Sequence, residues 1–221
     1  MENISVSELL DLKHTIAAEL FDGVKYPWEI LPKLGNFIVE LGRKLPSEEY
    51  DNPAENVWIA KGATIAESAH IAPPTIICRG AEVRHCAYIR GNVIIGADAV
   101  IGNSCELKNA LIFDGAQIPH FNYVGDSIVG YKAHMGAGAI TSNVKSNMTF
   151  VTVKTADGRI ETGMKKLGAI LGDFAEIGCQ CVLNPGSVVC RNSNIYPLTS
   201  VRGVIPPDSI CKGAGEVVKK V

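Results

Sequence analysis

The stretch that decides the fold is IAKGATIAESAHIAPPTIICRGAEVRHCAYIRGNVIIGADAVIGNSCE, residues 59–106. A large aliphatic side chain recurs at every sixth position, at Ile59, Ile65, Ile71, Ile77, Val83, Ile89, Ile95, Ile101 and Leu107. Small side chains follow the same rhythm, at Ala63, Ala69, Thr75, Ala81, Ala87, Val93 and Ala99. A period of six fits neither an amphipathic helix nor a half-buried strand of a hairpin sheet.

Such a repeat predicts a β-helix. Each block of six supplies one short strand and a turn, and three blocks close a triangular coil whose aliphatic side chains point inward. Because no single coil can bury its own apolar face, the coils must stack through parallel strand pairing. We therefore predict a mainly β protein built as a hexapeptide-repeat parallel β-helix.

The rhythm slips once and is interrupted once. The spacing shortens by one residue near Ile112, Ile118 and Val124, and the repeat returns at Leu171, Ile177, Leu183, Val189, Ile195 and Val201. In between, TFVTVKTADGRIETG (149–163) alternates in polarity around Asp157 and Gly158, which predicts a type I′ hairpin. We expect this insertion, residues 143–167, to project as a lid or as an arm toward a neighbouring subunit. A solvated loop without function is the alternative.

The first 50 residues have a helical pattern instead. Ser5 and Glu8 have the spacing of a capping box before a helix that Gly23 would end. A second helix is expected at 28–45, after Pro27 and with Pro32 in its first turns. We predict a helical cap or trimer-packing element at 1–50, a linker at 47–56, the β-helix at 51–215 and a tail at 216–221.

Composition excludes several classes of function. The chain has 221 residues, 47% hydrophobic and 20% charged, which is ordinary for a soluble globular protein. With a net charge of -2 and no long basic run, nucleic acid is not an expected partner. The polar, acidic start MENISVSELL and the absence of any long apolar run favour a cytoplasmic protein without a membrane partner.

Cysteine usage fits the same compartment, because the seven cysteines are odd in number and scattered, as reduced thiols are. They are Cys78, Cys86, Cys105, Cys179, Cys181, Cys190 and Cys211.

Polar residues are unusually dense between positions 90 and 143. They are Arg90, Glu106, Lys108, His120, Asn122, Tyr123, Asp126, His134 and Asn143. Here the chain carries ELKN at 106–109, PHFNYVGDS at 119–127, GAGAITSN at 136–143 and KKLGAILGD at 165–173. Over roughly residues 75–210 it resembles the acetyltransferase half of bifunctional glucosamine-1-phosphate acetyltransferase / N-acetylglucosamine-1-phosphate uridyltransferase. Its resemblance to the archaeal sugar-1-phosphate counterparts is closer.

The resemblance implies a left-handed β-helix and a set of site residues. His120 matches the general base that deprotonates the sugar amine, and Asn143 an asparagine near the amine or thioester. Arg90 and Lys108 match cations that hold the sugar phosphate, and Tyr123 a tyrosine that contacts substrate. Acetyl-CoA is implied as co-substrate, in contact with Gly136, Ala137, Gly138, Cys179 and Pro197, and with Arg202 near its phosphates. The implied setting is nucleotide-sugar or cell-envelope precursor synthesis by a homotrimer.

The chain departs from that pattern in places. Thr149 and Thr152 stand where relatives have lysines, with Lys145 and Lys154 offset, and His134 replaces an asparagine of the bacterial enzymes, at a position we include in the substrate site. Residues 1–50 contain no Gly-rich nucleotide loop, so the resemblance leaves out the uridyltransferase half.

Two other functions stay open. The γ-type carbonic anhydrases use the same scaffold with three histidine ligands to zinc, and His85 and His120 have nearly their separation. The third ligand expected just after His120 is missing, and we expect no metal to be needed for acyl transfer. A non-catalytic trimeric scaffold or sugar-nucleotide binding module is the other alternative.

Overall fold

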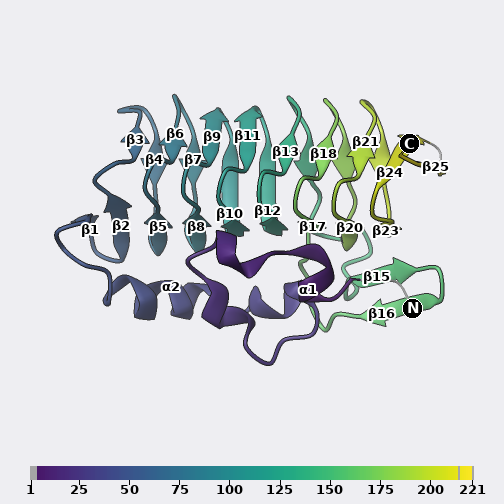
Figure 1. Cartoon of the computed structure of the whole chain (residues 1–221), viewed down its shortest axis with the longest axis horizontal. Coiled ribbons are helices and arrows are strands. Elements are labelled where there is room, and N and C mark those ends of the chain that lie inside the picture. Colours follow the sequence, from purple (N-terminus) through teal and green to yellow (C-terminus); the bar gives the residue numbers. More distant parts are fainter. Residues whose placement is uncertain (1–3, 214, 221) are drawn as a thin grey trace.

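The computed structural model describes residues 4–213 and 215–220, and it confirms the predicted fold class. Short strands stack in parallel along the long axis of the molecule, and the N-terminal segment and a hairpin lie along one side (Figure 1). The coil has three walls, which we number in the order in which the chain passes through them.

The first wall consists of β2 (Val57–Ala60), β5 (Thr75–Ile77), β8 (Val93–Ile95), residues 110–112 of β10 (Glu106–Ile112), 127–129 of β12 (Tyr123–Val129), β17 (Ala169–Leu171), β20 (Ser187–Val189) and β23 (Val204–Ile205). The second wall consists of β3 (Thr64–Ile65), β6 (Glu82–Val83), β9 (Val100–Asn103), β11 (Gln117–His120), β13 (His134–Met135), β18 (Glu176–Ile177), β21 (Asn194–Ile195), β24 (Ser209–Gly213) and the antiparallel β25 (Glu216–Lys219). The third wall consists of β4 (His70–Ile71), β7 (Tyr88–Ile89), the starts of β10 and β12, β14 (Ile140–Thr141), β19 (Val182–Leu183) and β22 (Ser200–Val201).

Strand register locates the slip in the repeat. Thr75 pairs with Val93, which is 18 positions further along the chain. Val93 pairs with Ala110 and Ala110 with Ser127, and each of these steps covers only 17 positions. The missing residue comes from the corner between the third and first walls, so β10 and β12 run around that corner without a break.

The predicted aliphatic column fills the interior. Ile77, Val83, Ile89, Ile95, Ile101 and Leu107 are fully buried, and Ile59, Ile65 and Ile71 pack against them at the first coils. Buried Leu, Ile and Val side chains each contribute roughly 1.5–3 kcal/mol, so this column is the main source of the coil's stability.

The N-terminal segment packs along the outer side of the first wall. It contains α1 (Val6–Leu9), three short 3₁₀ helices, η1 (Leu12–His14), η2 (Ala18–Phe21) and η3 (Pro27–Ile30), and α2 (Leu34–Gly42). Its apolar side chains form a second core with the outward residues of the first wall, such as Ile76, Ile94 and Leu111. A methyl group at Gly42 would come within 2.3 Å of the Trp58 ring, so only glycine allows this contact. The predicted role of this segment in trimer packing stays a prediction.

The predicted capping box is wrong, because the Ser5 side chain makes no capping hydrogen bond and α1 ends after one turn. The segment follows the first wall as short pieces instead of one helix to Gly23. The predicted second helix is divided into η3 and α2 around Pro32, which cannot donate the hydrogen bond that a continuous helix needs.

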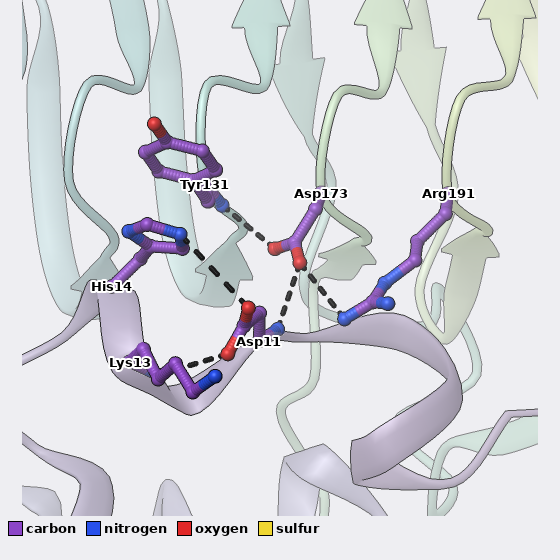
Figure 2. A network of polar contacts seen from close by, with 6 residues as sticks. All are labelled: Asp11, Lys13, His14, Tyr131, Asp173 and Arg191. Carbon is purple, nitrogen blue, oxygen red and sulfur yellow. Dashed lines mark hydrogen bonds and ion pairs between the residues drawn. The ribbon is translucent and has the colours of Figure 1, made fainter.

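A buried carboxylate holds this segment on the coil. Asp173 Oδ2 accepts the backbone N–H of Asp11 at 2.7 Å and pairs with Arg191 at 2.9 Å, while Oδ1 accepts the backbone N–H of Tyr131 at 2.9 Å (Figure 2). The His14 ring stacks on Tyr131 with 3.6 Å between centroids. Burial raises the pKa of Asp173 above its ordinary value, although both N–H donors and Arg191 act in the opposite direction.

The predicted hairpin forms, as β15 (Thr152–Thr155) and β16 (Gly158–Glu161). Thr155 pairs with Gly158, so the loop is Ala156-Asp157, one residue earlier than predicted. The expectation of a projecting lid or arm is wrong. Val151 and Val153 are buried against the first wall, where β15 contacts β20 and β23, because alternate valines present an apolar face to it.

The predicted linker is also more ordered than expected. Residues 50–54 form β1 (Tyr50–Ala54), which pairs antiparallel with β2 and is interrupted by a bulge. Among the described residues, no helix has the length and apolar character needed to cross a membrane.

Candidate functional site

His120 lies at the corner between the second and third walls, which we call the His120 corner. Successive coils are joined there by backbone hydrogen bonds: Ser104 N–H to His85 O, Phe121 N–H to Asn103 O, Gly138 N–H to His120 O, Gln180 N–H to Ala137 O and Leu198 N–H to Cys179 O. The His120 side chain is exposed and has no hydrogen bond or ion pair within the described part of the chain. A free, exposed imidazole can accept a proton from a bound ligand.

The buried Asn122 fixes the backbone of this corner. Its Oδ1 accepts the backbone N–H of His120 at 3.0 Å, and its Nδ2 donates to Gly136 O at 2.8 Å and Ala139 O at 2.9 Å. With 2% exposure it is shielded from water. One amide therefore connects the backbone of His120 to the next coil, which holds Gly136, Ala137 and Gly138.

The outer side of the third wall carries the predicted substrate residues. Register places Tyr88, Glu106 and Tyr123 side by side on neighbouring strands. Arg90 pairs with Glu106 at 2.6 Å, so its charge is already matched. The Lys108 ammonium has no polar partner among residues 4–213 and 215–220, and it is the unpaired cation here.

The corner between the third and first walls, which we call the Asp126 corner, holds a stack of short polar side chains. Asp126 is 5% exposed and accepts Asn109 Nδ2 at 2.9 Å and Asn143 Nδ2 at 2.5 Å. Asn143 Nδ2 also donates to the Tyr123 hydroxyl at 3.2 Å. Burial, followed by the negative charge of Asp126, raises the pKa of Tyr123 above its ordinary value, so the phenol stays neutral near pH 7.

The predicted coenzyme residues divide into two groups. Ala137, Cys179 and Pro197 stack directly beyond His120 at the His120 corner, with Gly136 and Gly138 beside them. Arg202 lies apart from them, after β22 on the third wall, where its guanidinium donates to Asn184 Oδ1 at 2.9 Å.

The chain matches a known protein family in sequence. The profile of the GMPPB C-terminal domain family matches residues 71–196, more than half of the chain. The chain belongs to this family. It is 33% identical over 196 residues to "Bifunctional protein GlmU" of Methanococcus maripaludis (strain C5), which covers 86% of this chain and 47% of that protein. The predicted family resemblance is thereby confirmed.

Other relatives extend the comparison. "Uncharacterized acetyltransferase YaiX" of Escherichia coli O6:K15:H31 (strain 536) is 33% identical over 167 residues, with 69% of this chain and 73% of that protein covered. The crystal structure of the polySia-specific acetyltransferase NeuO aligns at 11% identity and a TM-score of 0.48, over 76% of this chain and 88% of that one. The chain spans about half the length of the bifunctional relatives.

Within this member of the GMPPB C-terminal domain family, some predicted residues lie away from His120. His134 is on the second wall and pairs with Glu176 at 3.0 Å. Thr152 is on the hairpin, and the exposed Thr149 precedes it, bonded to Asn147 Oδ1 at 2.9 Å. The predicted influence of His134, Thr149 and Thr152 on the choice of acceptor stays a prediction.

The zinc alternative has little geometric basis. His85 is two coils from His120, roughly 10 Å at a strand spacing of about 4.8 Å. Its ring nitrogens contact Ser68 Oγ and Cys86 Sγ. In the described ranges, no three His, Cys, Asp or Glu side chains gather closely enough to hold a metal ion.

Sequence reasoning missed the roles of Asn122 and Asp126. Asn122 occupies the inward corner position at which other coils carry Ala87, Cys105, Ala139 or Cys181. An amide in a column of small buried side chains needs hydrogen-bond partners, and that is the signal that could have identified it.

Proposed function

We propose that the chain is a cytoplasmic, acetyl-CoA-dependent N-acetyltransferase acting on an amino-sugar 1-phosphate or a nucleotide-linked amino sugar. The names of its relatives support acyl transfer, since they include GlmU and acetyltransferases. The observation that carries the proposal is the His120 corner itself, where an exposed imidazole with no polar partner in the described part of the chain sits on a backbone held by buried Asn122.

The chemistry proposed for His120 is general-base catalysis. The sugar amine attacks the thioester carbonyl carbon while the neutral imidazole takes a proton from that nitrogen. The tetrahedral intermediate collapses, the C–S bond breaks, and the proton goes to the coenzyme thiolate. The products are the N-acetylated sugar and free coenzyme A, and no metal is needed.

Small residues beyond His120 suit a coenzyme at this corner. Gly136, Ala137 and Gly138 present almost no side-chain volume, and Gly138 has the positive φ of 71° that favours glycine. The proposed acetyl-CoA site follows this corner toward Cys179 and Pro197, with Arg202 assigned to its phosphates.

The third wall is the proposed acceptor site. Lys108 can neutralise a phosphate directly, whereas Arg90 must share its charge with Glu106. Tyr123 and Asn143 form a neutral hydrogen-bonded pair beside them. A ligand here can have its phosphate at Lys108 and its amine toward His120.

A homotrimer is part of the proposal. Phe121 is 64% and Leu198 81% exposed at the His120 corner, and apolar side chains at such exposure favour burial by another subunit. This would enclose the corner that the coenzyme occupies.

The test is acetyl transfer to glucosamine-1-phosphate, galactosamine-1-phosphate and their nucleotide-linked forms, with products detected by mass spectrometry. His120→Ala should lower kcat by about 10²- to 10⁴-fold. His85→Ala is the matched control at the same corner and should leave the rate unchanged. Full activity of His120→Ala would show that His120 is not the general base. Absence of transfer by the wild type would favour a scaffold or binding module, and stoichiometric zinc would favour the carbonic anhydrase alternative.

A further inference from the structure

A groove runs between the N-terminal segment and the Asp126 corner. Its volume is about 480 Å³, within the range of roughly 300–1,000 Å³ typical of small-molecule sites. Pro32, Gly35 and Asn36 line it from the N-terminal side, and Asn92, Lys108 and Asn109 from the coil. The groove therefore adjoins the proposed phosphate position but lies on the side away from the His120 corner.

The two sides of the groove are closely fitted. A methyl group at Gly35 would come within 2.4 Å of the Asn92 side-chain oxygen, so the first turn of α2 lies directly against the corner. The buried Leu34 and Ile38 hold α2 on the first wall. This fixes the outer side of the groove relative to Lys108.

Charge in the groove favours an anionic ligand. Lys108 brings an ammonium that has no polar partner among the residues that the structure describes. The carboxylate of Asp126 also lines the groove, but it accepts amide hydrogens from Asn109 and Asn143. The start of α2 adds the positive end of its helix dipole.

We propose that this groove holds the part of the acceptor that lies beyond its first phosphate, which makes the preferred acceptor an amino sugar linked to a nucleoside diphosphate. The inference rests on the proposed function. A free 1-phosphate ends at Lys108 and leaves the groove unused. A second phosphate and a nucleoside extend past Lys108 into the groove, where Pro32 and Val39 offer apolar surface and Asn36 and Asn92 offer amides.

The geometry of the third wall fits this assignment. Glu106 pairs with Tyr123, and Lys108 follows two residues later, about 7 Å along the strand toward the groove. In a 2-amino sugar the amine and the phosphate are carried on neighbouring ring carbons. The sugar and first phosphate therefore occupy the third wall, and only a longer acceptor reaches Asn36.

The test compares glucosamine-1-phosphate with uridine-diphosphate-glucosamine as acceptors. Asn36→Trp fills the groove from an exposed position, and Glu40→Trp is the control, at an exposed position one turn further along α2 that does not line the groove. Asn36→Trp should raise KM for the nucleotide-linked acceptor at least about tenfold and leave KM for the 1-phosphate unchanged. Asn36→Ala, which removes only the amide, should raise KM for the nucleotide-linked acceptor by about 3- to 10-fold. Glu40→Trp should change neither KM.

Binding of uridine diphosphate without catalysis separates this inference from the proposed function. Calorimetry should show uridine diphosphate binding to the wild type and to His120→Ala, and loss of binding in Asn36→Trp. If the wild type acetylates the 1-phosphate but neither binds uridine diphosphate nor responds to Asn36→Trp, the groove assignment is overturned and the proposed function stands. If no acceptor is acetylated but uridine diphosphate binds in an Asn36-dependent way, the proposed function fails and the groove assignment stands.

Discussion

Asn122→Ala tests whether one buried amide holds the candidate site together. The change leaves the backbone N–H of His120 without its acceptor and removes a donor from Gly136 O and Ala139 O. An unsatisfied buried group costs about 1–3 kcal/mol, and a lost hydrogen bond with partial replacement costs about 0.5–1.5 kcal/mol. Gly136 O keeps a second donor, the backbone N–H of Ala139 at 3.1 Å. The free-energy cost of losing the Asn122 hydrogen bond to Gly136 O is therefore at the low end of this range.

Together these losses predict a decrease of about 2–5 kcal/mol in the free energy of unfolding. In a protein of this size that corresponds to a fall in Tm of about 4–20 °C, measurable by circular dichroism. The matched control is Asn103→Ala one coil earlier, where the side chain makes a single bond to His85 O at 3.2 Å near the surface. Its expected cost is within about 0.5 kcal/mol.

Asn122→Asp gives a second readout in the same assay. A carboxylate would keep the acceptor for His120 N–H but would face the oxygens of Gly136 and Ala139. Its pKa would then rise above the unfolded value of about 3.9, and stability would be lost as pH rises, by up to about 1.4 kcal/mol per pH unit. Equal Tm values for Asn122→Ala and Asn103→Ala, or an Asn122→Asp variant insensitive to pH, would refute the role given to Asn122.

Three further predictions concern other parts of the molecule. Tyr123→Phe removes the acceptor of an Asn143 hydrogen bond and should lower kcat/KM by about 2- to 10-fold. Because the raised pKa keeps the phenol neutral, the pH–rate profiles of Tyr123→Phe and the wild type should have the same shape between pH 6 and about 9, and a lost alkaline limb would contradict this. Asp173→Asn should destabilise the attachment of the N-terminal segment, measured by urea unfolding. Since the folded pKa of Asp173 is raised, its carboxyl stabilises most below about pH 4 and loses this contribution as pH rises through the folded value. The difference in free energy of unfolding between the wild type and Asp173→Asn should therefore shrink with rising pH. A difference that grows would contradict the upward direction of the Asp173 pKa shift. Iodoacetamide at pH 8 should alkylate Cys86 rapidly, as read by peptide mass spectrometry, because this thiol is exposed. Cys78 should resist until unfolding, since burial raises its pKa to about 12.

The interior of the coil could be predicted from sequence because its period is set by geometry alone. The aliphatic side chains at the centre of each wall point inward at a fixed period, so Ile77, Val83 and Ile89 mark their walls without knowledge of tertiary contacts. The packing of the N-terminal segment was harder to foresee, although neighbouring aliphatics such as Ile76-Ile77 and Ile94-Ile95 carried a signal. A strand with apolar residues on both faces needs a cover on its outer side.

The hairpin shows where local patterns are insufficient. Alternation around Asp157 and Gly158 predicts two paired strands, but it does not state what covers their apolar face. Val153 of β15 and the neighbouring Val151 pack on the first wall of their own chain, in one core cluster with Val188 and Val204, because β15 lies against β20 and β23. The position of the hairpin was therefore decided by a long-range contact that periodicity does not encode.

The candidate acceptor site and the irregularity of the repeat lie at the same corner of the coil. An ordinary coil places three residues between its third and first walls, as in Arg90-Gly91-Asn92, whereas the shortened coils place two, Lys108-Asn109 and Gly125-Asp126. In both kinds of coil the last connecting residue has a positive φ, 52° at Asn92, 47° at Asn109 and 49° at Asp126, a region that Asn and Asp tolerate better than most residues. Their short side chains can then bond directly to one another across coils, and Asn143 continues the stack at the residue where the insertion leaves. The two shortened coils thus place Asn109 and Asp126 in one stack, which continues to Asn143 and the Tyr123 hydroxyl beside Lys108.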